Sequence, residues 1–261
     1  MPEMTLEGGV RIRTYTPPRL RSADRRPADL ERYGFPARPD DPHHLARYRQ
    51  VFGQLKQKFH YVQPTFRVNT DRHHGPRARG TEEATETSTN WSGGVVYAPA
   101  GASFRWVEGD WVVPNVDAPT QSQWYYTSSW IGIDGDGSRD VCQAGVECDV
   151  YQSGSSITRQ IYPWWEWYPN FEVQITNLAV SAGDMITMLI CTSGANATTA
   201  SVALSRQLYR ERVEVKTRHA SRRCDGILPL RGSFGSEDSQ CGSGDEVALK
   251  VEGVMNRAVH A

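Results

Sequence analysis

Two side chains of this sequence, Gln143 and Glu166, could together activate a water molecule. Glu166 stands inside a Trp-Trp-Glu-Trp-Tyr-Pro string that begins at Trp164. A carboxyl group among indole rings is poorly solvated when charged, so its pKa should rise and it could exchange protons at mildly acidic pH. A glutamine amide beside it could orient the water and donate a hydrogen bond to a developing oxyanion. We therefore predict Gln143 and Glu166 as catalytic residues.

Aromatic side chains surround this pair in the sequence. All eight tryptophans lie between Trp91 and Trp167. So dense a cluster indicates either an aromatic core or a groove that binds a ligand. A purely structural interpretation also stays open, in which Glu166 does no more than accept hydrogen bonds from indole N–H groups.

Other common catalytic and metal-binding patterns do not occur in the sequence. Five of the seven histidines precede residue 75, and the others are His219 and His260, so no Ser/His/Asp or Cys/His arrangement is indicated. We expect the histidines of the N-terminal part to be solvated. The five cysteines lack metal-site spacing and indicate one disulfide at most. Asp134-Gly-Asp-Gly predicts a tight turn rather than a calcium loop. We expect no metal ion and no cofactor.

These residues lie in a part of the chain that has the two-residue apolar alternation of β-strands. Gly, Pro, Asn and Asp turns separate the alternating runs without intervening helices, which predicts an all-β sandwich or barrel. The predicted strands are 104–106, 111–113, 124–133, 157–168, 171–180, 185–191, 201–206, 212–216 and 246–254. The arginine-rich stretch 205–231 does not share this pattern.

Residues 1–88 differ in composition and predict a basic leader ahead of a sandwich domain at 89–261. Residues 1–89 hold 16 Lys and Arg against 11 Asp and Glu, whereas the rest of the chain holds 13 against 19. The Pro-rich stretch 1–42 should be extended or disordered, 43–59 has the spacing of one amphipathic helix, and 68–89 resembles a linker. We predict that the leader covers an acidic groove of its own domain and leaves more readily as carboxylates protonate.

The sequence also argues against nucleic acid and membrane as partners. The leader is rich in proline and has no stacking motif, so we expect no nucleic-acid binding. No stretch is apolar enough to span a membrane, and residues 1–10 have neither the basic nor the apolar region of a signal peptide.

Four ordered motifs resemble those of the glutamic peptidases, or eqolisins. They are Asn-Trp-Ser-Gly from Asn90, Trp-Ile-Gly-Ile-Asp-Gly from Trp130, Gln-Ala-Gly from Gln143 and Trp-Glu-Trp-Tyr-Pro from Trp165. The resemblance implies a concanavalin-like sandwich of two antiparallel sheets with the active site in a concave face. It also implies a secreted endopeptidase with a propeptide, which cleaves protein or peptide substrates at acidic pH without metal or cofactor.

The resemblance places the family's catalytic glutamine at Gln143. The family's catalytic glutamate lies on a later strand of the form Ala-Glu-Trp-Ile-x-Glu, which this sequence lacks. Glu166 would then be a neighbouring carboxylate that shapes the site or takes over the missing role, and the other candidates are Glu214, Glu237 and Glu252. The expected substrate-binding residues are Trp91, Trp130, Asp134, Trp165 and Trp167.

These expectations combine into one prediction and one alternative. The prediction is a monomeric glutamic-type acid endopeptidase that uses a Gln/Glu pair to activate water. The alternative is a non-catalytic β-sandwich that binds peptide or carbohydrate, or an inactive peptidase homologue. A second carboxylate close to Gln143 would discriminate between them, because a binding module needs none.

Overall fold

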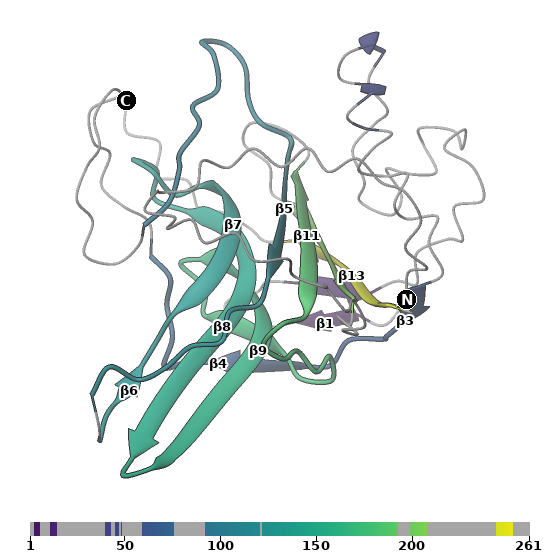
Figure 1. Cartoon of the computed structure of the whole chain (residues 1–261). Helices are drawn as coiled ribbons and strands as arrows, with labels where there is room; N and C mark the ends of the chain where they lie inside the picture. Colours follow the sequence, from purple (N-terminus) through teal and green to yellow (C-terminus); the bar gives the residue numbers. More distant parts are fainter. Residues whose placement is uncertain are drawn as a thin grey trace, which may run out of the picture.

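The chain is built from β-strands, as its alternating pattern predicts. The computed structural model describes residues 3–5, 11–14, 40–42, 45–46, 48, 59–75, 92–120, 122–192, 199–207 and 244–252. Within these residues thirteen strands form two sheets, which face each other as a sandwich (Figure 1). The prediction of an all-β fold with two antiparallel sheets is confirmed, with one parallel pairing as an exception.

The first sheet contains the parallel pairing. Six of its strands follow the order β1-β2-β13-β12-β11-β5, and β3 pairs with β13 in the parallel direction. The bounds are β1 Glu3–Thr5, β2 Arg11–Thr14, β3 Phe59–Tyr61, β5 Trp106–Val112, β11 Met185–Thr192, β12 Thr199–Gln207 and β13 Gly244–Glu252.

The second sheet carries the predicted catalytic residues. Its strands follow the order β4-β10-β9-β8-β6, and β7 also pairs with β8. The bounds are β4 Phe66–Asn69, β6 Trp124–Tyr125, β7 Ser128–Asp134, β8 Val141–Ser153, β9 Ser156–Tyr168 and β10 Glu172–Ile175. The long hairpin of β8 and β9 runs through the middle of this sheet (Figure 1). Its two-residue turn contains Gly154, whose positive φ of 60° is accessible to glycine at low cost.

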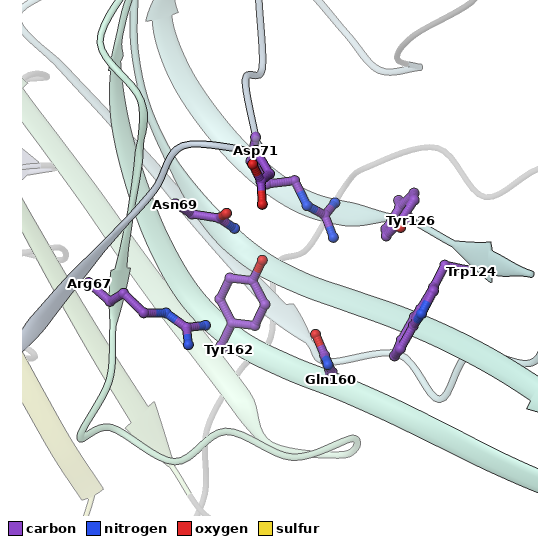
Figure 2. A pocket seen from close by; sticks show the side chains of 8 residues that line it. Arg67, Asn69, Asp71, Trp124, Tyr126, Gln160 and Tyr162 are labelled. Carbon is purple, nitrogen blue, oxygen red and sulfur yellow. The ribbon is translucent and has the colours of Figure 1, made fainter.

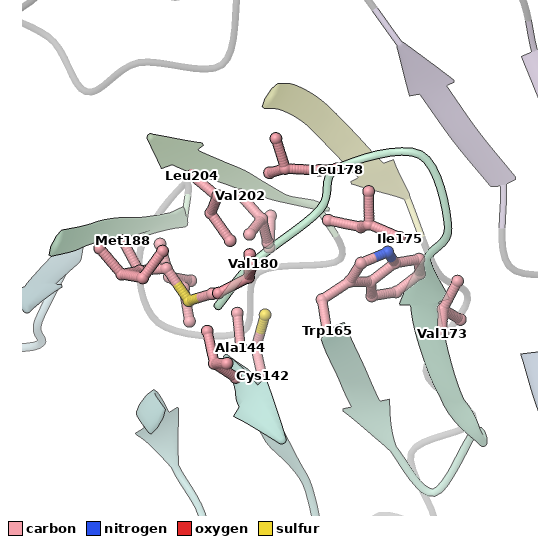
Figure 3. Close-up of a cluster of buried hydrophobic side chains, with 14 of the residues drawn as sticks. Cys142, Ala144, Trp165, Val173, Ile175, Leu178, Val180, Met188, Val202 and Leu204 are labelled. Atoms are coloured by element: carbon pink, nitrogen blue, oxygen red, sulfur yellow. The ribbon is translucent and has the colours of Figure 1, made fainter. Parts of the chain in front are cut away.

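The hydrophobic core lies between the two sheets. Side chains from β8, β9 and β10 point toward those of β11 and β12, where aliphatic, sulfur and indole groups interlock (Figure 3). Ile186, Met188 and Ile190 of β11 have no exposed surface. Burial of each such side chain contributes about 1.5–3 kcal/mol. The core also holds free thiols: Cys142, Cys148 and Cys191 are buried and unbridged, and Cys224 and Cys241 lie outside the described residues.

One strand that the sequence analysis did not predict is β8. Apolar residues do alternate along β8, but several of them are small, such as Cys142 and Ala144, so the alternation is weak. Its polar members, which include Glu147 and Asp149, belong to types that are uncommon in strands. The predicted strand 171–180 also shortens to β10, and the predicted strand 212–216 lies outside the described residues.

The leader contributes strands to both sheets. Within the predicted extended stretch 1–42, β1 and β2 belong to the first sheet, and the predicted linker 68–89 is wrong at its start because Val68 and Asn69 end β4. The predicted helix 43–59 is described only in part. Pro42, Leu45, Ala46 and Tyr48 have helical backbone, whereas Phe59 starts β3, so the helix ends before that residue. Among the described residues, no helix is long and apolar enough to cross a membrane.

Candidate active site

Gln143 and Glu166 face each other across the β8–β9 hairpin. The antiparallel register pairs them directly, so their side chains project from the same face of the second sheet. Gln143 is 1% exposed and Glu166 is fully buried. Nε2 of Gln143 donates a long hydrogen bond of 3.4 Å to Oε2 of Glu166. The two predicted catalytic side chains are therefore in direct contact.

The face that carries this pair is rich in carboxyl groups. Because alternate residues of a strand point to opposite sides, β8 places Glu147 and Asp149 beside Gln143, and β10 adds Glu172. All three carboxyl side chains are 1% exposed or less. We call this surface the acidic face; it consists of Gln143, Glu147, Asp149, Glu166 and Glu172.

Leader residues Arg72–Gly75 lie across the acidic face. The main chain of His74 contacts both members of the predicted catalytic pair. Its N–H donates to Oε2 of Glu166 at 3.0 Å, and its carbonyl oxygen accepts from Nε2 of Gln143 at 2.5 Å. One peptide segment thus contacts both the Gln143 amide and the Glu166 carboxyl group.

The imidazole of His74 lies in a niche of the acidic face. The ring stacks on Trp164 with centroids 4.1 Å apart and planes inclined by 9°. Its Nε2 lies 2.8 Å from Oε2 of Glu172 and 3.1 Å from Oε1 of Glu147. Burial alone would lower the pKa of His74, but the two adjacent carboxylates outweigh that effect and raise it to about 9. His74 is therefore a cation at neutral pH.

Arg72 makes the second ion pair between the leader and the acidic face. Its Nη2 lies 2.5 Å from Oδ2 of Asp149, and its guanidinium sits 4.0 Å above the ring centre of Tyr126. Burial and the neighbouring Glu147 raise the pKa of Asp149 to about 7, against the opposing effect of Arg72. The Arg72–Asp149 pair is therefore sensitive to pH around neutrality.

Glu166 is a fully buried carboxyl group with a raised pKa. Burial raises its pKa, and the hydrogen bond from the His74 N–H and the charges of His74 and His73 act in the opposite direction. His73 contributes through Nδ1, which lies 3.3 Å from Oε1 of Glu166.

Gly145 allows two indoles to flank the acidic face. It pairs with Trp130 of β7 on one side and with Trp164 of β9 on the other. A Cβ atom at this position would lie 2.6 Å from the Ser129 carbonyl oxygen, 2.7 Å from Trp130 and 3.0 Å from Trp164. The glycine of the Gln-Ala-Gly motif is therefore required by close packing. The indole N–H of Trp164 donates a hydrogen bond to the Ser128 hydroxyl oxygen at 2.9 Å.

The predicted substrate-binding residues separate into three groups. Trp130 is half-buried on the acidic face, and Asp134 is exposed at the end of β7. Trp165 and Trp167 instead lie in the core, 2% and 5% exposed. This placement differs from the sequence prediction because strand alternation turns both indoles away from Glu166. Trp91 lies outside the described residues.

A hollow of about 300 Å³ opens beside Arg72 at the edge of the acidic face (Figure 2). Leader side chains line one part of it and sheet side chains the other, with the rings of Trp124 and Tyr126 nearly parallel at 6.4 Å. The lining residues are Arg67, Asn69, Asp71, Arg72, Trp124, Tyr126, Gln160 and Tyr162. Flat rings beside amide and charged groups could contact a peptide or a sugar.

The sequence analysis missed Glu147, Asp149, Glu172 and His74. The first two follow Gln143 at even spacing, which would have placed them on its face if β8 had been recognised as a strand. The expectation of solvated leader histidines is wrong for His74, whose side chain is 23% exposed. Among the alternative carboxylates, the backbone of Glu252 belongs to β13 in the first sheet. Glu214 and Glu237 lie outside the described residues.

Comparison with known sequences decides the family. The sequence model of the peptidase A4 family matches residues 89–221, half of the chain. The chain belongs to the peptidase A4 family. This match confirms the resemblance to glutamic peptidases. The matched segment includes all five residues of the acidic face, whereas His74 precedes it.

Two curated relatives of this A4 family member are similar over part of their length. Aspergillopepsin-2 of Aspergillus niger is 30% identical over 123 residues, 40% of this chain and 41% of the relative. Scytalidopepsin B of Scytalidium lignicola is 29% identical over 117 residues, 44% of this chain and 39% of the relative. The chain thus spans about two fifths of the length of the curated relatives it matches. Among solved structures none matches it.

Proposed function

We propose that this chain is a glutamic-type endopeptidase of acidic conditions, in which Gln143 and Glu166 activate the water that attacks a peptide bond. The observation that carries the proposal is the 3.4 Å contact between these two buried side chains. It lies within the segment that matches the peptidase A4 family. A second carboxylate beside Gln143 is the feature that a binding module would not need.

The main chain of His74 supports the role of each residue. Its carbonyl oxygen already accepts a hydrogen bond from the Gln143 amide, and its N–H already donates to Glu166. A substrate in the same position would present its scissile carbonyl oxygen to Gln143. Such fixed positioning of the reacting group can itself supply a large part of the rate enhancement.

The proposed reaction needs only these two side chains and one water. Glu166, as a carboxylate, takes a proton from the water as the water oxygen bonds to the carbonyl carbon. The carbonyl oxygen becomes an oxyanion and accepts a hydrogen bond from the Gln143 amide. Glu166 then returns the proton to the amide nitrogen, the C–N bond breaks, and a carboxylic acid and an amine leave. A raised pKa suits Glu166, because it must both accept and donate this proton.

The leader would keep this site closed until acid opens it. Residues Arg72–Gly75 occupy the position that we assign to substrate, and their cations pair with Asp149, Glu147 and Glu172. As the pH falls, Asp149, whose pKa is raised to about 7, takes up a proton and loses its attraction for Arg72. We therefore expect activity to appear only in acid, after the segment has left the acidic face.

The test is digestion of a denatured protein by the full chain at several pH values between about 3 and 5. Gln143→Ala removes the proposed oxyanion donor and should lower turnover by roughly 100- to 1,000-fold. A matched control is Gln152→Ala, which removes a glutamine near the tip of the same hairpin, where its amide donates to the Gly154 carbonyl. Equal activity of Gln143→Ala and the unmodified chain would contradict the mechanism.

A second candidate is a sandwich that binds peptide or carbohydrate without cleaving it. The hollow of Figure 2 supports it, because Trp124 and Tyr126 present parallel rings beside polar side chains. The same digestion separates the two candidates. Retention of peptides or oligosaccharides without cleavage, unaffected by Glu166→Gln, would favour the binding protein.

A further inference from the structure

We propose that His74, Glu147 and Glu172 bind a divalent transition-metal ion such as Zn²⁺, which fastens the leader to the second sheet. Each residue offers one ligand atom, and these three atoms all lie within 4.8 Å of one another. The three residues come from the leader, β8 and β10. An ion bound by these atoms would therefore connect three separate elements.

The separations between the ligand atoms suit a small cation. Nε2 of His74 is 2.8 Å from the Glu172 oxygen and 3.1 Å from the Glu147 oxygen. Around tetrahedral Zn²⁺, with bonds of roughly 2.0–2.2 Å, neighbouring ligand atoms lie about 3.3 Å apart. Small side-chain rotations would open the group to that spacing. The ion would take the place of the proton on Nε2 of His74, which is released to solvent. One imidazole with two carboxylates then leaves a fourth position for water.

The hydrogen bonding of this group is incomplete without an ion. Nε2 of His74 carries at most one proton, and its hydrogen bond is made with Oε2 of Glu172. Oε1 of Glu147, which is buried, lies 3.1 Å from the same nitrogen as an ion-pair partner, but it accepts no hydrogen bond within the part of the chain that the structure describes. A buried carboxylate oxygen without a partner is costly. A metal ion between the three atoms would contact all of them at once.

The charges of the acidic face also favour a bound cation. Four buried carboxyl groups lie there, whereas Arg72–Gly75 brings one guanidinium and two imidazoles, and His73 leaves 39% of its side chain exposed. A divalent ion would offset the excess of negative charge. The ion would lie where the carboxylates of Glu147 and Glu172 both approach Nε2 of His74.

Neighbouring side chains hold the three ligands in place. Nδ2 of Asn69 donates to Oε1 of Glu172 at 3.1 Å, which leaves Oε2 directed toward His74. The stacked indole of Trp164 fixes the plane of the imidazole. Such outer contacts orient metal ligands, and their loss typically lowers metal affinity by about 10- to 100-fold.

The test is titration of the full chain with Co²⁺ near neutral pH, followed by displacement with Zn²⁺. We expect one ion per chain to give the visible absorption of a four-coordinate cobalt site and to raise the melting temperature. His74→Ala and Glu172→Gln should each lose that ion. Asn69→Ala should keep the spectrum but bind roughly 10- to 100-fold more weakly.

The matched control is His73→Ala, which removes the adjacent histidine without touching the three ligands and should bind Co²⁺ as the unmodified chain does. Circular dichroism of each variant verifies the fold. If His74→Ala does not fold, the isosteric Glu172→Gln still shows whether a ligand is needed for Co²⁺ binding. Unchanged Co²⁺ binding in both ligand variants would overturn the proposal. So would the absence of a four-coordinate spectrum in the unmodified chain. Neither result depends on peptidase activity.

Discussion

The two faces of the β8–β9 hairpin are both buried, but by different means. One face, which carries Ala144 and Trp165, packs against aliphatic side chains of the first sheet. The acidic face is covered by Arg72–Gly75 through ion pairs and main-chain hydrogen bonds. Apolar packing is insensitive to pH, whereas an ion pair ends when its carboxyl group is protonated. The comparison teaches that burial alone does not reveal whether a surface is permanent core or a site with a removable cover.

The largest expected difference between the faces is in catalysis. Glu166→Gln keeps the shape of the side chain and removes the proposed proton acceptor. A positioned general base contributes roughly 100- to 10,000-fold, so turnover should fall by at least about 100-fold while the melting temperature changes little. Steady-state kinetics at acidic pH and a thermal melt provide both readings. Full activity of this variant would assign Glu166 a packing role only.

The corresponding change on the core face should affect stability instead. Trp165→Ala removes a side chain that is 2% exposed and packs against the first sheet, and such truncations cost about 3–5 kcal/mol of unfolding free energy. The loss should be the same at pH 5 and pH 7, because packing carries no proton. Denaturant unfolding at both pH values measures it. A loss confined to one pH would show that the two faces are coupled.

The charge of His74 should make the free energy of unfolding depend on pH. Its pKa of about 9 in the folded chain exceeds the ordinary 6.5 because Glu147 and Glu172 surround it. Its contribution is therefore complete below pH 6.5 and is lost as the pH rises through about 9. The unfolding free energy should fall by up to roughly 3 kcal/mol over this range.

His74→Gln provides the comparison for that measurement, with a chelator present throughout. The ionisable groups that face the ring are Glu147, Glu166 and Glu172. Asp149, whose pKa is about 7, titrates at the lower end of this range in both proteins. The variant should show a flatter stability profile between pH 6.5 and 10. An equal decline in both proteins would assign the effect to another group.

The smallest expected effect belongs to a single methyl group on the core side. Ile186→Val shortens a side chain that is fully buried in β11, which typically costs about 0.5–1.5 kcal/mol. Because the core face and the acidic face are separated by the hairpin, peptidase activity should not change. A fall in turnover larger than the fall in stability would contradict that separation.

Strand alternation made most of the fold predictable from the sequence. It predicted an all-β sandwich or barrel and the strands that contain Trp130 and Glu166, whereas the choice of a sandwich came from the resemblance to glutamic peptidases. The structure brings Gln143 and Glu166 into direct contact. The same alternation also assigns the tryptophans of β9 to different faces. It separates Trp164, on the acidic face, from Trp165 in the core, and a count along β9 would have made that distinction.

The rest of the site could not be read from local pattern, because it depends on contacts distant in sequence. His74 meets Glu147 and Glu172 across 73 and 98 residues. A histidine in a polar, Arg-rich stretch gives no local sign of such a partner. The charge difference between leader and domain predicted docking in general, but the sequence could not specify which four residues make the contact.

The strand β4 has a consequence for any form of the protein that loses its leader. Phe66–Asn69 pairs along the whole of Glu172–Ile175, and β10 has β9 on its other side. Without β4, the outer edge of β10 would present unpaired N–H and C=O groups. Such an edge recruits further extended chains and promotes aggregation. We therefore expect a fragment that begins at residue 89 to be less soluble than the full chain, so that the leader acts as a built-in guard against self-association.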